Sequence, residues 1–175
     1  MTKFGEDGPA IYVAGKVRQN CFRHRLVRGL RNHEGTQNLI ADGFVYTGPF
    51  FTSCDHGCCH GSSMHGNGSR GCTETDGRLY TFNNCLAGVM RADMVFAYIE
   101  SPDCYGTLFE LGVAYLSGKP TILVFSPEMD GIERDFWFPA IKAKEVHLNV
   151  PISGLPKILT RAIDRLEGGE YGLFL

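Results

Sequence analysis

Short apolar runs alternate along the chain with longer amphipathic segments. Four of these runs, at 10–15, 43–51, 93–100 and 120–125, are nearly continuous in apolar residues, which is typical of strands buried on both faces. The run EVHLNV (145–150) predicts a fifth strand.

The segments between the runs predict helices. In the first of them Phe22, Leu26 and Val27 fall at helical spacing on one face. The expected ranges are 19–31, 75–91, 106–118 and 155–169. Strands that alternate with helices in this way favour a parallel sheet with helices on both faces, and we expect one domain over residues 1–175.

Composition narrows the classes of function. The chain has 175 residues, 43% of them hydrophobic and 21% charged, with a formal net charge of −2, so nothing favours a nucleic acid or an anionic membrane as a partner. No apolar run reaches the roughly 20 residues of a membrane span, and the first ten residues do not resemble a signal peptide. Seven cysteines, an odd number without a secretion signal, indicate reduced thiols and a cytoplasmic location.

A ligand site is expected at one edge of the predicted sheet. In parallel α/β sheets ligands bind at the carboxyl ends of the strands, near the point where the strand order reverses. Residues 12–18, 47–72 and 100–110 follow or end predicted strands and therefore belong to that edge.

One acidic residue in this region stands among apolar neighbours. Glu110 lies one turn into the predicted helix that starts at Gly106 and Thr107, and Phe109 and Leu111 flank it. The free N–H groups of a first helical turn favour negative charge nearby. On spacing alone, Glu110 is either a solvated or capping acid at a helix start or a functional carboxylate.

The stretch YGTLFELGVAYLSGKPTILVF (105–125) resembles the signature of the nucleoside 2-deoxyribosyltransferase superfamily. IYVAG (11–15) resembles the first strand of that superfamily, and FNNCLAGVMRADMVFAYIE (82–100) resembles its second helix and third strand. The resemblance implies a flavodoxin-like (Rossmann-like) α/β fold with five parallel strands, usually assembled into homodimers or larger homo-oligomers.

The same resemblance implies a reaction. Glu110 would attack the anomeric carbon of a nucleoside or nucleoside 5′-monophosphate, and water or a second base would resolve the covalent glycosyl-enzyme. Tyr12 would hold the Glu110 carboxylate, Asp103 would assist, and Asn84 would hold the sugar. Gly106 and Thr107 are further candidates for substrate binding. No organic cofactor is needed.

Two positions depart from the superfamily pattern. An acid is expected where this chain has Cys85, and a second acid where it has Cys104. Asp103, one residue earlier, could substitute for the second acid. The two cysteines fit packing positions, and a non-catalytic nucleotide-binding module on the same fold remains a second hypothesis.

The segment FTSCDHGCCHGSSMHGNGSRGC (51–72) is rich in glycine, cysteine and histidine. It fits a lid in which Asp55, His56 and His60 hydrogen-bond to the base. A zinc site of mixed ligands and a flexible or redox-sensitive surface loop are the alternatives, and the spacings lack the paired C-x2-C that is typical of zinc sites. We therefore expect no metal among the site residues.

A short basic turn joins the first strand to the first helix. Gly15, Lys16 and Arg18 lie there beside free helix N–H groups, a suitable place for a 5′-phosphate. The alternative is a basic, solvated helix start.

Overall fold

The structure of the protein, a computed structural model, describes residues 4–17, 21–30, 37–50 and 75–172, together with the backbone of residues 59–60 and 63–64. Side chains within 75–78 are not described.

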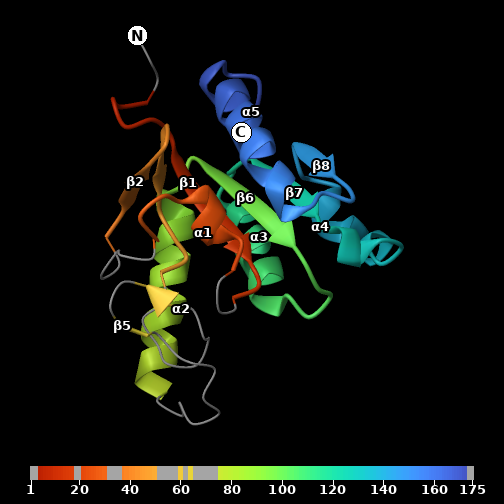
Figure 1. Ribbon diagram of the computed structural model, residues 1–175, viewed down its shortest axis with the longest axis horizontal. Coiled ribbons are helices and arrows are strands. Elements are labelled where there is room, and N and C mark those ends of the chain that lie inside the picture. The colour runs from red at the N-terminus through yellow and green to blue at the C-terminus, as the bar shows by residue number, and fades with distance from the viewer. Residues whose placement is uncertain are drawn as a thin grey trace.

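A six-stranded sheet forms the centre of the molecule (Figure 1). Its order is β2-β3-β1-β6-β7-β8, and every neighbouring pair is parallel except the antiparallel pair β2–β3. The strands are β1 (Ala10–Gly15), β2 (Leu39–Ala41), β3 (Phe44–Tyr46), β6 (Met94–Ile99), β7 (Thr121–Phe125) and β8 (Glu145–His147). The fold is therefore α/β with a mixed sheet. The prediction of a sheet with five parallel strands was incomplete, because a sixth strand, β2, pairs antiparallel at the edge.

The extra strand comes from a short hairpin that the sequence analysis missed. The turn between β2 and β3 is Asp42-Gly43, and Gly43 has a φ of 81°. An Asp-Gly pair between short apolar runs is a strong hairpin signal, because glycine adopts positive φ without steric cost.

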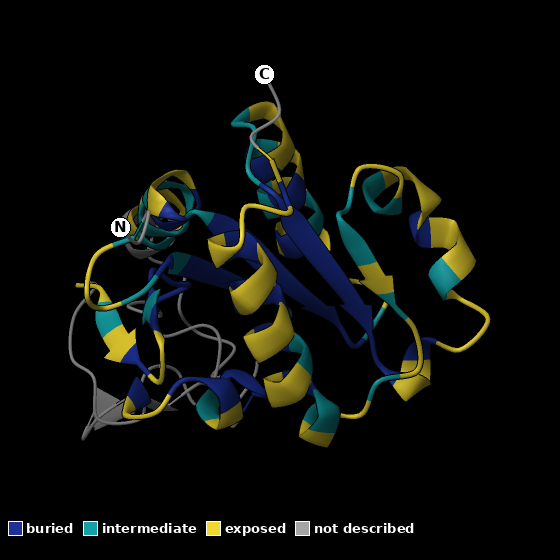
Figure 2. Ribbon diagram, turned by 90° about the horizontal axis from the view of Figure 1, so that it is seen from above, coloured by how far each residue is buried: buried dark blue, intermediate teal, exposed yellow. Residues whose placement is uncertain are grey.

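Helices cover both faces of the sheet, and Figure 2 shows the sheet buried between helices whose outer sides are exposed. On one face, α1 (Arg23–Leu26) and α5 (Leu155–Glu167) pack on Ile11, Val13 and their neighbours. On the other face, α2 (Thr75–Arg91) and α3 (Tyr105–Leu116) pack on Tyr12, Ala14 and theirs. The strict alternation along β1 follows from the two-residue period of a strand, and it turns the Tyr12 side chain toward α2 and α3.

The other predicted elements differ from the structure mainly at their ends. The helix expected at 19–31 is only four residues long, because Val27 takes an extended conformation and Gly29 has a φ of 83°. The strand expected at 43–51 ends at Tyr46, before the Gly48-Pro49 pair, and proline has no N–H to continue the ladder. The small helix α4 (Trp137–Ala140), after the 3-10 turn Glu133–Phe136, was not predicted.

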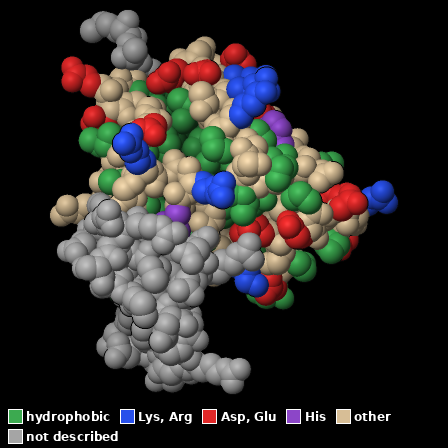
Figure 3. Space-filling model, in the orientation of Figure 1, with side chains coloured by type: hydrophobic (Ala, Val, Ile, Leu, Met, Phe, Trp, Pro, Cys, Tyr) green, Lys and Arg blue, Asp and Glu red, His purple; other side chains and the backbone are tan. Residues whose placement is uncertain are grey.

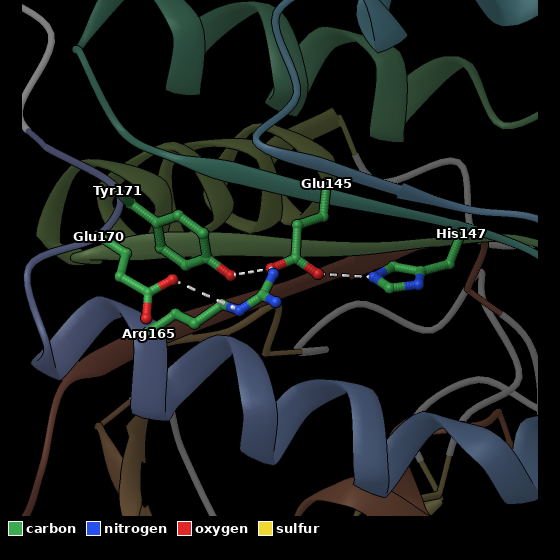
Figure 4. A network of polar contacts seen from close by, with 5 residues as sticks. All are labelled: Glu145, His147, Arg165, Glu170 and Tyr171. Carbon is green, nitrogen blue, oxygen red and sulfur yellow. Dashed lines mark hydrogen bonds and ion pairs between the residues drawn. The ribbon is translucent and has the colours of Figure 1, made fainter.

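A polar network ties the end of the chain to the edge strand β8 (Figure 4). Glu145 accepts hydrogen bonds from Tyr171 and from Arg165 (2.6 Å), and its second oxygen lies 2.7 Å from His147 Nε2. These partners lower the pKa of Glu145 against the opposing effect of burial. The network fixes α5 and the residues after it against the sheet.

The surface carries charges of both signs. On the face shown in Figure 3, Lys and Arg side chains are scattered and lie near Asp and Glu side chains. Within the ranges that the structure describes, no helix has the length and apolar character needed to cross a membrane.

Candidate functional site

The site is built where the strand order reverses. The chain passes from β1 to β3 on one side and later returns to β6 on the other, so β1 and β6 lie side by side with their carboxyl ends together (Figure 1). Gly15 and Tyr98 are partners at this end of the pair. This is the position at which ligands bind in open α/β sheets.

Tyr12 and Glu110 meet in this region across 98 residues of sequence. The Tyr12 hydroxyl donates a hydrogen bond to Glu110 Oε1 at 2.5 Å. Tyr12 is fully buried on β1, and Glu110 projects from the second turn of α3, because the helix begins at Tyr105. The first turn of α3 contains no acid, so Glu110 does not lie beside the free N–H groups of that turn, as the sequence predicted. Its carboxylate is instead held by the Tyr12 hydroxyl.

Two glycines shape the cavity in which the Tyr12 ring lies. A Cβ atom at Gly88 would come within 2.4 Å of the Thr47 carbonyl oxygen and 2.9 Å of Tyr12 Cε2. A Cβ atom at Gly48, which has a φ of 133°, would lie 3.1 Å from the same ring atom. Helix α2 can therefore approach β1 closely only because residue 88 is glycine. This close approach fixes the ring and, through its hydroxyl, the Glu110 carboxylate.

Glu110 opens into a pocket of about 260 Å³ between α2 and α3. This volume is close to the lower end of typical ligand pockets, about 300 Å³. Glu110 is the one carboxylate among the described residues that line this pocket. The other lining residues contribute apolar side chains, one thiol and a glycine. These are Phe82, Cys85, Leu86, Val89, Gly106, Phe109 and Val113.

The electrostatics of the pair follow from burial. Loss of water raises the pKa of Glu110 from 4.5 to about 7, although the Tyr12 hydrogen bond and the positive charge of Arg23 act in the opposite direction. Burial, together with the Glu110 charge, raises the pKa of Tyr12 well above its usual value, so the hydroxyl remains a donor. Burial likewise raises the pKa of Cys85 to about 11 and keeps its thiol neutral. Near pH 7 the pair thus contains one titrating group, the Glu110 carboxyl.

Asp103 lies at the same edge but has other partners. Its carboxylate forms an ion pair with Lys16 (2.5 Å) and accepts a hydrogen bond from Ser101 Oγ (2.6 Å). These two bonds lower the pKa of Asp103. A carboxylate held in its ionised form is poorly suited to donate a proton to a leaving base. The ion pair instead joins the turn after β1 to the turn after β6.

The remaining described candidates have different surroundings. Gly15 packs tightly, since a Cβ there would come within 2.7 Å of the Phe22 ring and 2.8 Å of the Tyr98 carbonyl oxygen. Gly106 lines the pocket, and Thr107 is buried in the first turn of α3. Asn84 Nδ2 is buried and has no hydrogen-bond partner among the described residues, so it can still receive an acceptor.

Arg18, Asp55 and His56 lie outside the described residues, and for His60 only the backbone is described, in a short strand pair. The lid and zinc hypotheses for residues 51–72 therefore stay predictions. Among the residues that are described, no group of three or more His, Cys, Asp or Glu side chains is arranged to hold a metal ion.

Sequence reasoning missed Arg23, which is completely buried. Its guanidinium contacts the end of β1 and its charge acts on Glu110. The sequence contains a signal for this residue, since Arg23 falls on the same helical face as Leu26, Val27 and Leu30. An arginine on an apolar face is almost never fully buried unless its guanidinium is paired.

Comparison with known proteins adds no assignment: no family model matches the chain, and no curated protein matches it.

Proposed function

We propose that this protein cleaves the N-glycosidic bond of a nucleoside or nucleoside 5′-monophosphate, of the ribo or deoxy series, with Glu110 as nucleophile. The observation that carries the proposal is the short hydrogen bond from the buried Tyr12 hydroxyl to a carboxylate that opens into a pocket. The resemblance of residues 11–15, 82–100 and 105–125 to nucleoside 2-deoxyribosyltransferases points to the same chemistry. The order of the five parallel strands, β3-β1-β6-β7-β8, agrees with a flavodoxin-like arrangement.

In the first step an oxygen of the Glu110 carboxylate attacks the anomeric carbon of the sugar. The C–N bond breaks, its electron pair leaves with the base, and the base takes a proton from solvent. The transition state has oxocarbenium character and is stabilised by the nearby negative charge. Tyr12 donates to one carboxylate oxygen and orients the other, while the apolar pocket walls keep competing water away.

In the second step water, or a nitrogen of another base, attacks the same carbon. The bond from the sugar to Glu110 breaks and returns the carboxylate, and the attacking group loses its proton. Asn84, whose buried Nδ2 has no hydrogen-bond partner among the described residues, is suited to hold a sugar hydroxyl. The turn that contains Lys16 is suited to a 5′-phosphate only if the phosphate displaces Asp103 from its ion pair.

The test is base release measured by liquid chromatography. Nucleosides and 5′-monophosphates of both sugar series are incubated with the protein and with Glu110→Gln, with and without a second free base. We expect release that is lost in Glu110→Gln, and a new nucleoside would demonstrate transfer. An equal rate in both proteins would refute the nucleophilic role.

A second function, nucleotide binding without catalysis, is favoured by one observation. The Cys85 thiol, which stands where an acid is expected, is a weak acid because burial raises its pKa to about 11, and Asp103 is held ionised by Lys16 and Ser101. No described side chain near Glu110 is thus an evident proton donor for the leaving base. Ligand binding by calorimetry without any base release would favour this function.

We further propose that the protein forms a homo-oligomer through the outer face of α3 and α4. A groove of about 920 Å³ runs between α3 and the segment 132–142. At about 200 Å² for a large side chain, the exposed apolar side chains of its lining leave roughly 560 Å² in water on each subunit, or about 1,100 Å² over two subunits, just above the roughly 1,000 Å² expected of a biological interface. They are Phe109, Tyr115, Ile132, Phe138 and Ile141.

Sedimentation equilibrium tests this interface. Phe138→Asp should convert the oligomer to monomer, because it places a charge among the apolar residues that line the groove. Ile40→Asp, at an exposed apolar residue on β2 that does not line the groove, is the control and should leave the assembly intact. A monomeric wild-type protein at micromolar concentration would refute the proposal.

A further inference from the structure

Two rows of residues line the Glu110 pocket, one on each helix. In both rows the spacing is i, i+3, i+4 and i+7, which places each row on one face of its helix. Helix α2 leads into β6 and α3 follows it, so the first residue of each row lies nearest the carboxyl edge of the sheet, where ligands bind. The rows are Phe82, Cys85, Leu86 and Val89 on α2, and Gly106, Phe109, Glu110 and Val113 on α3.

Two phenyl rings stand at the open end of this pocket. The ring centroids of Phe82 and Phe109 are 5.5 Å apart, and the ring planes are tilted by 45°. Despite this contact the two residues are 45% and 52% exposed, whereas Val89, at the far end of the α2 row, is completely buried. Phenylalanine is among the residues most often buried. Two rings that stay half in water beside a cavity therefore indicate a surface that receives a ligand.

The proposed reaction requires a surface for the base beside Glu110. The carbon that Glu110 attacks is bonded directly to a nitrogen of the base, so the base and the carboxylate must be neighbours. The pocket of about 260 Å³ is smaller than the roughly 300–1,000 Å³ of most ligand sites, so part of a nucleoside must extend past its open end. Among the described lining residues, Phe82 and Phe109 carry the only aromatic rings, and only Cys85 and Glu110 have side chains that can form hydrogen bonds.

We propose that Phe82 and Phe109 form the base-binding platform of the site: they stack against the flat face of the nucleobase and hold it beside Glu110. This inference rests on the function proposed above. Every nucleobase has a π face, so such a platform recognises planarity and tolerates different groups on the edge of the base. The tilt between the two rings gives a base that stacks on one ring an oblique contact with the other. We therefore expect both purine and pyrimidine nucleosides among the substrates.

Phe82 is the residue of the platform that can be tested alone. Phe109 also lines the groove proposed as the subunit interface, whereas Phe82 does not. Phe82→Leu keeps an apolar side chain but removes the ring, and Phe82→Tyr keeps the ring. Tyr80→Leu is the matched control, because Tyr80 lies on the same helix, is 54% exposed and lines neither cavity.

The experiment is a proton NMR titration of each protein with uracil and with dihydrouracil. The two ligands share the same hydrogen-bonding edge, but dihydrouracil is neither aromatic nor planar. We expect the wild type to bind uracil at least about tenfold more tightly than dihydrouracil, and the C–H signals of bound uracil to move upfield because of the phenyl ring currents. Phe82→Leu should weaken uracil binding about tenfold, as expected for one lost stacking contact. Phe82→Tyr and Tyr80→Leu should bind uracil like the wild type.

The base-release assay gives a second readout. Phe82→Leu should raise KM about tenfold for purine and for pyrimidine nucleosides, and it should change kcat by less than about threefold, because Glu110 and Tyr12 are unaltered. Sedimentation of Phe82→Leu should match that of the wild type. A loss of binding that accompanies a loss of assembly would assign Phe82 to a subunit contact and contradict the platform.

Equal affinity of the wild type for uracil and dihydrouracil would overturn the inference. Uracil binding that Phe82→Leu leaves unchanged, or that Tyr80→Leu weakens equally, would do the same. Should Phe82→Leu fail to fold, the comparison of the two ligands on the wild type decides alone.

The platform and the proposed function fail separately. Base release with an unchanged KM in Phe82→Leu would keep the cleavage reaction and overturn the platform. Uracil binding that depends on Phe82, without base release from any substrate, would refute the cleavage reaction and support the platform.

Discussion

The Glu110 carboxyl should make the folded protein less stable as the pH rises, and Glu110→Gln should relieve this effect. In the unfolded chain the carboxyl titrates near 4.5, whereas in the folded protein its pKa is about 7, chiefly because of burial. Between these values the folded state binds more protons than the unfolded state, so the free energy of unfolding falls as the pH increases. The stabilisation by the proton is complete below about pH 4.5 and is lost above about pH 7.

The size of the effect follows from the shift. A rise from 4.5 to about 7, at about 1.4 kcal/mol for each pH unit, gives at most about 3.5 kcal/mol, of which about 3 kcal/mol falls between pH 4.5 and pH 8. Glutamine keeps the shape of the side chain and can still accept the hydrogen bond from Tyr12, but it does not titrate. The difference in stability between Glu110→Gln and wild type should therefore grow by up to about 3 kcal/mol between pH 4.5 and pH 8.

Urea unfolding at a series of pH values measures this difference, with the slope against urea held as a check on two-state behaviour. Glu167→Gln, at the exposed end of α5, is the matched control and should change stability by less than about 0.5 kcal/mol at each pH. A Glu110→Gln difference that is the same at pH 4.5 and pH 8 would refute the claim that the carboxyl is desolvated in the folded protein. It would also remove the reason to regard Glu110 as a carboxylate destabilised for function.

Three further predictions test the surroundings of the pair and the end of the chain. Tyr12→Phe removes a hydrogen-bond donor that lowers the pKa of the Glu110 carboxyl, so kcat/KM for base release at pH 7 should fall about tenfold. A pH profile of kcat/KM that does not move along the pH axis would contradict this role of the hydrogen bond. Gly88→Ala should lower the free energy of unfolding in urea by about 3 kcal/mol, because its Cβ would meet a backbone oxygen at 2.4 Å. Gly112→Ala, which has open space on α3, is the control and should raise that free energy by about 0.5–1 kcal/mol. Equal effects of the two substitutions would show that α2 and β1 are not in tight contact. Tyr171→Phe removes one hydrogen bond to Glu145 and should cost about 1 kcal/mol, with faster amide exchange in α5, and unchanged exchange would mean that the network does not anchor that helix.

Much of the architecture could be predicted from local pattern. The bounds of β1 and α2 agree with the expected ranges, because a buried strand is a continuous apolar run and a long helix repeats its apolar positions. The edge strand β2 (Leu39–Ala41) was missed although Asp42-Gly43 is a turn signal, since a strand of three residues carries too few positions for a period to be recognised. The short helix α4, rich in aromatic residues, was missed for the same reason.

The site shows where local pattern ends. The sequence alone determined that Tyr12 lies in an apolar strand and that Glu110 stands among apolar residues of a helix, and the superfamily resemblance suggested that the two belong together. Only the tertiary structure decided their contact, because 98 residues separate them and the face of β1 that meets α3 depends on how α2 packs at Gly88. It also decided that Asp103 pairs with Lys16 and that Arg23 holds the end of β1. A residue's type sets which bonds and charges it can offer, but its partners, its loss of water and therefore its pKa are properties of the packed molecule.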